Sequence, residues 1–140
     1  MVKDLLEEDN RVIGYLTGVS AFNKLGLTTQ VSNTIEIGTN ISRSARRRGK
    51  YSIRFILQKN TITKDNIYLL QILDSIRFIK RIPDSDTANS CSVLISLIKD
   101  LSEDDKKGIA KYALKYNPGT RALTGAILDK VSEQEITQSL

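Results

Sequence analysis

The feature that most constrains the fold is a change in the spacing of apolar residues near residue 60. Before it, apolar and polar side chains alternate in residues 33–39 and 50–57, which is typical of half-buried β-strands. After it, apolar residues recur every three or four positions, as in amphipathic helices. Strands followed by helices predict an α+β fold, in which a small antiparallel sheet packs against a long helix and a C-terminal group of three short helices.

The strand region also contains turn signals. Residues 41–47 and 50–57 are predicted to form a hairpin that turns near Arg48 and Gly49. Upstream, Thr17 is expected to cap a short helix, and Gly26 lies where a left-handed helix stop is expected. Residues 27–32 are then interpreted as a loop.

The longest predicted helix covers residues 64–81, with Thr63 as its N-cap and Pro83 preventing continuation. A polar linker, residues 84–90, is expected to follow. Ser102 and Asn117 are predicted to cap the last two of the three short helices, and residues 132–140 are expected to be a frayed polar tail. The buried stripe of the long helix is expected to comprise Leu69, Ile72, Leu73, Ile76 and Ile79.

These boundaries predict one domain of ordinary size. Residues 1–13 are interpreted as a leader or a linker remnant, and residues 14–140 as a single α+β domain. Within that domain we expect a core at 14–82, a helical layer at 84–131 and the tail at 132–140.

Positive charge is concentrated between residues 41 and 60. This segment holds seven Lys and Arg residues and no acid, whereas the whole chain has a net charge of +5, so the remainder is slightly acidic. Arginine predominates, which favours bidentate contacts with phosphates or carboxylates. The alternative is a mobile loop that is basic only because loops are polar. The candidate contact residues are Arg43, Arg46, Arg47, Arg48, Lys50 and Arg54, with Lys59 completing the segment.

Composition makes an enzyme an unfavoured interpretation. The chain has no histidine and a single cysteine, Cys91, which excludes the usual zinc sites and the commonest general base. We expect no catalytic residue, no metal and no cofactor. No apolar run reaches the roughly 20 residues of a membrane helix, and the acidic N-terminus lacks a secretory signal, so we expect a cytoplasmic protein with no membrane contact.

One stretch resembles a known family. Residues 16–40, LTGVSAFNKLGLTTQVSNTIEIGTN, resemble the start of the C-terminal domain of AbiEi-type antitoxins and related transcriptional regulators. The resemblance extends over roughly residues 14–82, and a strand, a basic segment, a second strand and a long helix follow in the expected order. The motif residues that we single out are Thr17, Gly18, Asn23, Gly26 and Gln30.

The resemblance implies a toxin–antitoxin, abortive-infection or phage-defence role, in which this domain counteracts a nucleotidyltransferase toxin. Such proteins usually carry an N-terminal winged helix-turn-helix that binds their own promoter. Only about 13 residues precede the match here, so we expect either a fragment of a longer regulator or a stand-alone antitoxin half. Asn23 and Gln30 either fix a loop or face a partner, and for Gln30 we favour a structural hydrogen bond to loop backbone.

Three functions remain open at this point. The first is a non-enzymatic antitoxin or regulator domain that contacts DNA or RNA through the basic hairpin. The second is a protein-interaction module that neutralises an acidic partner directly. The third, and least favoured, is a nuclease that uses Glu36 and Asp65 with Mg²⁺. The toxin, the nucleic-acid site and the oligomeric state are not specified by the sequence.

Overall fold

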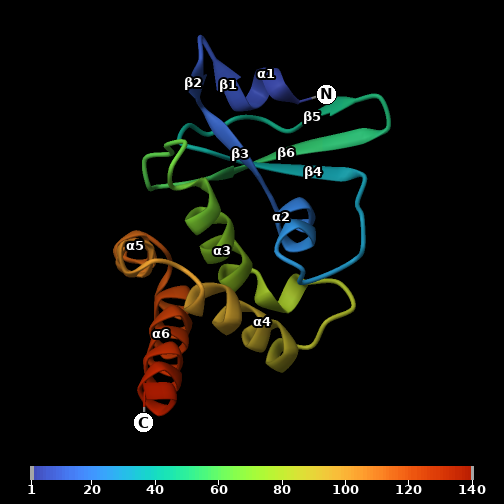
Figure 1. Ribbon diagram of the computed structural model, residues 1–140. Helices are drawn as coiled ribbons and strands as arrows, with labels where there is room; N and C mark the ends of the chain where they lie inside the picture. Colours follow the sequence, from blue (N-terminus) through green and yellow to red (C-terminus); the bar gives the residue numbers. More distant parts are fainter. Residues whose placement is uncertain (1, 140) are drawn as a thin grey trace.

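The computed structural model describes residues 2–139 and confirms the α+β class. A four-stranded sheet separates a small N-terminal layer from a larger layer of helices (Figure 1). The elements are α1 (Lys3–Leu6), β1 (Glu7–Glu8), β2 (Arg11–Val12), β3 (Gly14–Thr17), α2 (Val19–Lys24), β4 (Thr34–Thr39), β5 (Arg46–Arg48), β6 (Tyr51–Leu57), α3 (Ile67–Arg77), the 3₁₀-helix η1 (Ile79–Arg81), α4 (Thr87–Lys99), α5 (Glu103–Ala113) and α6 (Pro118–Ser139).

The strand order in the main sheet is β3-β4-β6-β5. β5 and β6 form the predicted antiparallel hairpin, which turns at Gly49 and Lys50. Its first strand is shorter than the predicted 41–47, since β5 covers only Arg46–Arg48. The sheet was predicted to be antiparallel, but its central pair, β4 and β6, is parallel, because alternation within each strand does not reveal the direction in which strands pair. β3 was not predicted, because three of its four residues are buried and it shows no polar alternation.

The upper face of the sheet is covered by the N-terminal residues. Leu5 of α1 is buried against Ile37 of β4 and Ile53 of β6. Residues 1–13 were expected to be a leader or linker remnant, but the described part, from residue 2, supplies α1, the β1–β2 hairpin and this core contact. A single buried leucine in an acidic segment gives no periodic signal, so the sequence alone did not indicate the contact between Leu5 and the sheet.

α3 lies below the sheet and is buried almost on all sides. Its residues 69–76 are all buried, and the predicted apolar stripe packs against the other helices. The helix is shorter than the predicted 64–81, because Asn66, not Thr63, precedes it and η1 follows it. The Asn66 side chain accepts a hydrogen bond from the Thr63 backbone, so these residues fold into a turn before the helix.

The three C-terminal helices complete the main core. Leu94 of α4, Ile109 of α5 and Ile127 of α6 belong to the same buried cluster as α3. The expected linker at 84–90 was too long, since Asp86 caps α4 through the Asn89 backbone N–H. The predicted caps at Ser102 and Asn117 are confirmed by bonds from the backbone N–H groups of Asp105 and Thr120, respectively.

The frayed tail was also wrong for the described residues. α6 continues as a helix to Ser139, so the last of the three helices predicted to be short has 22 residues. Leu140 lies outside the described residues. Glu135 in this last stretch forms an ion pair with Lys106 of α5, and Val131 is buried. These tertiary contacts order a segment whose own sequence is polar.

Candidate functional site

The candidate contact residues lie on the β5–β6 hairpin at the edge of the sheet. We call residues 43–54 the basic hairpin. It comprises the approach to β5, β5 itself, the turn and the first half of β6. Because side chains of a strand alternate between faces, the pleat divides its cations between the two sides of the sheet. The sequence grouped them as one patch, and the fold distributes them over two.

On the α1 side, two arginines stack on one aromatic ring. The guanidinium carbons of Arg43 and Arg46 lie 4.6 Å and 5.5 Å from the centre of the Phe55 ring. Phe55 faces the same side as Ile53, so the ring supports both arginines from below. Stacking orients a guanidinium while its N–H groups remain available to an anion.

Arg48, on the same side, already has a partner. Its two terminal nitrogens each lie 2.8 Å from an oxygen of Asp4, which forms a bidentate ion pair. The hydrogen bond from Arg48 lowers the pKa of Asp4 to about 2, and the same bond raises the pKa of Arg48. This pair joins α1 to β5, so we assign Arg48 a structural role.

The opposite side of the basic hairpin carries Arg47 and Arg54. Arg47 donates to the Ser52 hydroxyl at 3.3 Å, and Arg54 is exposed on β6. Glu36 lies on β4, in register with Arg54 of β6. Its carboxylate lies against Gly18 and makes no ion pair with a residue from 2 to 139. Lys50 lies at the turn, with its ammonium 5.4 Å from the Tyr51 ring.

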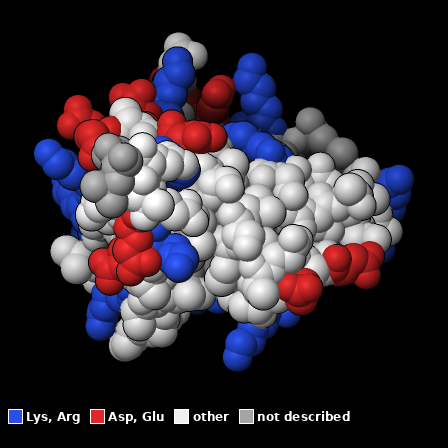
Figure 2. Space-filling model, turned by 60° about the horizontal axis from the view of Figure 1, so that its bottom comes forward, with Lys and Arg blue, Asp and Glu red and all other residues white. Residues whose placement is uncertain are grey.

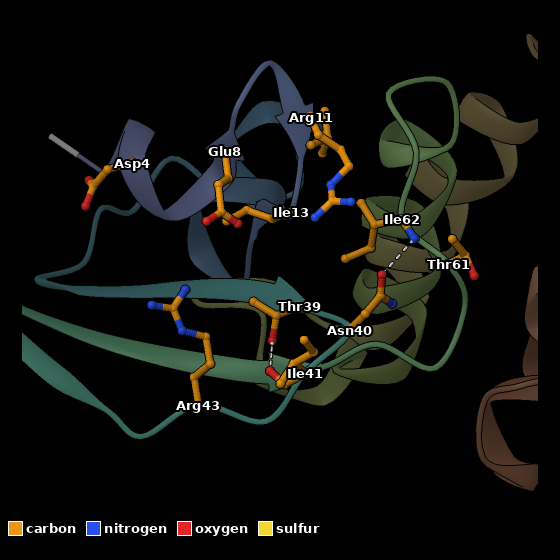
Figure 3. Close-up of a pocket in the computed structure, with 11 residues that line it drawn as sticks. Asp4, Glu8, Arg11, Ile13, Thr39, Asn40, Ile41, Arg43, Thr61 and Ile62 are labelled. Atoms are coloured by element: carbon orange, nitrogen blue, oxygen red, sulfur yellow. Dashed lines mark hydrogen bonds between the residues drawn. The ribbon is translucent and has the colours of Figure 1, made fainter.

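A pocket of about 620 Å³ adjoins the first side of the hairpin (Figure 3). Arg43 points into it from below, and Asp4 and Glu8 face it from the N-terminal segment. Arg11 enters from the other side. Since two bases and two acids line this pocket, its charge is balanced, and it does not favour an anion over a cation.

Of the family-motif residues, Gly18 and Gly26 shape the backbone, and Thr17 contacts the buried Asp74. Thr17 was expected to cap a helix, but it ends β3 and is buried, and its hydroxyl donates to Asp74 at 2.7 Å. Gly18 holds the cap position instead, with φ of 63° and ψ of −140°, a conformation essentially restricted to glycine. Gly26, at φ of 78°, makes the left-handed stop that the sequence predicted.

The other two motif residues fix the loop between α2 and β4. Asn23 donates to the backbone oxygen of Gln30 at 3.1 Å, and the Gln30 side chain donates to the Asp84 carboxylate. Gln30 is therefore structural, as favoured, but its side-chain partner is a carboxylate rather than loop backbone. Thr28 strengthens the same junction by donating to the Pro83 oxygen.

The sequence reasoning missed a buried polar network around Asp74, which is 2% exposed. The hydroxyls of Tyr15, Thr17 and Tyr116 donate to its carboxylate at 2.6, 2.7 and 2.6 Å. The Gln58 amide donates to both tyrosine hydroxyls, which directs both phenolic protons at Asp74. Burial raises the pKa of Asp74, and the three donors oppose that rise.

This network joins β3, β6, α3 and α5–α6, and each of its polar groups has a partner. Asp74 is almost fully buried and its carboxylate accepts hydrogen bonds from three hydroxyls, so we interpret it as a structural crosslink. The one signal in the sequence for this network was a charged residue, Asp74, among the apolar positions of α3. Its partners come from segments 40 to 60 residues away, as the separations of 42, 57 and 59 residues show.

Two wider features of the described residues bear on function. No group of three or more His, Cys, Asp and Glu side chains among them could hold a metal ion, and no described helix has the length and apolarity to cross a membrane. Figure 2 shows the underside of the view in Figure 1, where Lys and Arg lie around the margin of a broad uncharged surface. Positive charge on that face is peripheral.

Comparison with protein families, with curated proteins and with solved structures finds no match to this chain. The resemblance to AbiEi-type antitoxins therefore stays a prediction.

Proposed function

We propose that this chain is a non-enzymatic binding domain of the antitoxin or transcriptional-regulator type, which contacts nucleic-acid phosphates through the basic hairpin. The observation that carries the proposal is the stacking of Arg43 and Arg46 on Phe55 at the sheet edge. Neither arginine forms an ion pair with any residue from 2 to 139. Both guanidiniums are thus oriented by the ring and have no ion-pair partner among these residues.

The division of cations between two faces supports the same proposal. Arg43 and Arg46 lie on one side of the hairpin, while Arg47 and Arg54 lie on the other. β5 is the edge strand of the sheet, and β6 is paired with β4 on its other side, so these cations flank a sheet edge. Cations on both sides of that edge are suited to contact nucleic-acid phosphates, and such contacts fix position without selecting a sequence.

The antitoxin part of the proposal rests on the motif in residues 16–40. In this structure those residues form β3, α2 and the loop that Asn23 and Gln30 fix to Asp84. They therefore support the scaffold that positions the hairpin. We further propose that the domain acts in the cytoplasm and contacts a nucleotidyltransferase toxin there. Catalysis has no place in it, because Asp74 is enclosed by hydroxyl donors.

The experiment is a salt titration of binding to a fluorescein-labelled DNA duplex, followed by anisotropy. Removing one phosphate contact reduces the slope of log K against log salt by about 0.9. The Arg43→Gln, Arg46→Gln variant is expected to reduce the slope by about two and to weaken binding at least tenfold. Lys107→Gln, an exposed lysine of α5, is the matched control and leaves both quantities unchanged.

Equal affinity of wild type and the double variant at every salt concentration rules out the hairpin as the phosphate contact.

The second candidate function, direct neutralisation of an acidic protein, is favoured by the position of β5 at the sheet edge, where one side of its backbone is unpaired within the main sheet. Co-purification with a co-expressed nucleotidyltransferase toxin that survives nuclease treatment, but is lost in the same double variant, selects this second function.

A further inference from the structure

A second cavity lies at the opposite end of β6 from the hairpin turn. Its volume is about 480 Å³, and its walls come from the end of β6, the end of α3 and the α5–α6 connection. Four cationic side chains line it and no carboxylate does: Lys59, Arg77, Lys115 and Arg121. These residues are far apart in the sequence, and only the fold brings them together.

The two arginines of this cavity are held in place by neighbours. Arg121 donates to the backbone oxygen of Tyr116 at 3.2 Å, and the guanidinium of Arg77 stacks on the Phe78 ring at 4.7 Å. Lys59 and Lys115 are exposed and make no hydrogen bond or ion pair with a residue from 2 to 139. The cavity thus combines two oriented guanidiniums with two adaptable ammonium groups.

The floor of the cavity limits what can bind. Gln58 and Tyr116 line it, but their polar groups are already used by Asn60, Tyr15 and Asp74. The buried Asp74 lies behind this floor and offsets part of the positive charge. The lining still carries an excess of positive charge, and its four cationic side chains suit a multiply charged oxyanion.

We propose that this cavity is a binding site for a phosphate-bearing ligand, with Lys59, Arg77, Lys115 and Arg121 as its contacts. Arg121 and Arg77 supply bidentate donors for phosphate oxygens, and the two lysines neutralise the remaining charge. The volume is at the size of small-molecule sites, which favours a nucleotide or a single phosphorylated end over a long polymer.

This site is separate from the basic hairpin and does not depend on the proposed function. β6 rises about 3.3 Å per residue, so its length places the hairpin turn and the cavity roughly 20 Å apart. A variant of one site therefore leaves the other in place. The failure of either proposal can be read independently of the other.

The test titrates the whole chain with inorganic pyrophosphate and measures backbone amide shifts by NMR. We expect saturable shifts concentrated at residues 115–121. Lys115→Gln is expected to weaken binding about tenfold, as the loss of one charge-assisted contact implies. Because Lys115 has no partner in the described structure, this variant should keep the wild-type thermal transition. Arg121→Gln is expected to have the same effect on affinity.

A variant outside both proposed sites serves as the control. Lys107→Gln, on the exposed side of α5, should bind pyrophosphate as the wild type does. Weakening by this control equal to that of Lys115→Gln overturns the proposal, as does the absence of saturation at about 10 mM pyrophosphate.

A second set of probes identifies the source of the phosphate. A nucleoside triphosphate and a short single-stranded oligonucleotide, with and without a 5′-phosphate, are compared by competition against pyrophosphate. Competition by the triphosphate alone assigns the site to a free nucleotide. A requirement for the 5′-phosphate of the oligonucleotide assigns it to a nucleic-acid end. Competition by neither, despite pyrophosphate binding, overturns the assignment to these phosphate esters.

Discussion

Replacing Tyr116 with phenylalanine tests whether the Asp74 network holds the sheet against the helices. The ring of Tyr116 belongs to the main core, so Tyr116→Phe preserves its apolar contacts and removes only the hydroxyl. That hydroxyl donates to Asp74 at 2.6 Å and accepts from Gln58 at 2.8 Å. Gln58 retains Tyr15 as a partner, and Asp74 retains Tyr15 and Thr17.

The loss is therefore chiefly one hydrogen bond to a buried carboxylate. Hydrogen bonds to charged groups contribute about 1.5–3 kcal/mol, so we expect the free energy of unfolding to fall by about 2 kcal/mol. In a chain of this length each kcal/mol shifts Tm by roughly 3–4 °C, which predicts a decrease of roughly 6–8 °C.

Urea unfolding followed by circular dichroism at 25 °C measures the change, and an unchanged m-value shows that the same surface is exposed on unfolding. Tyr68→Phe is the matched control. Tyr68 lies on α3, is 36% exposed, and its hydroxyl makes no hydrogen bond with a residue from 2 to 139. A loss in Tyr116→Phe that is no greater than in Tyr68→Phe would refute the crosslink interpretation.

The same variant changes the response to alkaline pH. Burial, reinforced by the charge of Asp74, raises the pKa of Tyr116 above its ordinary value of 10.0. The folded state therefore favours the neutral phenol. This stabilisation is complete below pH 10.0 and is lost as the pH rises above it. Tyr116→Phe should lose less stability than the wild type between about pH 9 and about pH 11, and an unchanged dependence would contradict the assignment.

Two further predictions concern the N-terminal layer and the sheet. The hydrogen bond from Arg48 lowers the pKa of Asp4 to about 2 from 3.8, so the ion pair stabilises the fold above pH 3.8 and is lost as the pH falls toward 2. Asp4→Asn should remove that part of the acid dependence of Tm, and an identical acid profile would show that the pair contributes nothing. Gly38→Ala places a Cβ against the ring of Tyr15, which is fixed at Asp74, so calorimetry should show a loss of about 1–3 kcal/mol. Gly125→Ala, on α6 with no atom within 4 Å of the new Cβ, is its control and should be neutral or stabilising.

Local patterns were sufficient for the elements whose signals lie within a few residues. The hairpin turn next to Gly49, the caps at Ser102 and Asn117 and the stop at Gly26 were predicted because turn chemistry and capping act over one to four positions. Errors occurred where tertiary contact overrides local preference. α6 remains helical through a polar stretch that packs against α5, and the acidic N-terminus folds onto the sheet through Leu5.

The candidate sites show the same division. The cationic segment could be found from the sequence, but charge counting treats Arg43 through Lys59 as one group. The pleat sends Arg43 and Arg46 to one face and Arg47 and Arg54 to the other, and Asp4 takes Arg48 as an ion-pair partner. Thr17 was expected to cap a helix, but it donates a hydrogen bond to Asp74, because β3 places it above α3.

By itself the sequence determined the α+β class and the concentration of positive charge before residue 60, because periodicity and composition are properties of neighbouring residues. The tertiary structure decided which of those charges are free, what Asp74 does, and that Lys59 joins Arg77, Lys115 and Arg121 around one cavity. Such groupings depend on the parallel β4–β6 pairing and on helix packing. These are contacts between residues tens of positions apart, for which no local pattern carries information.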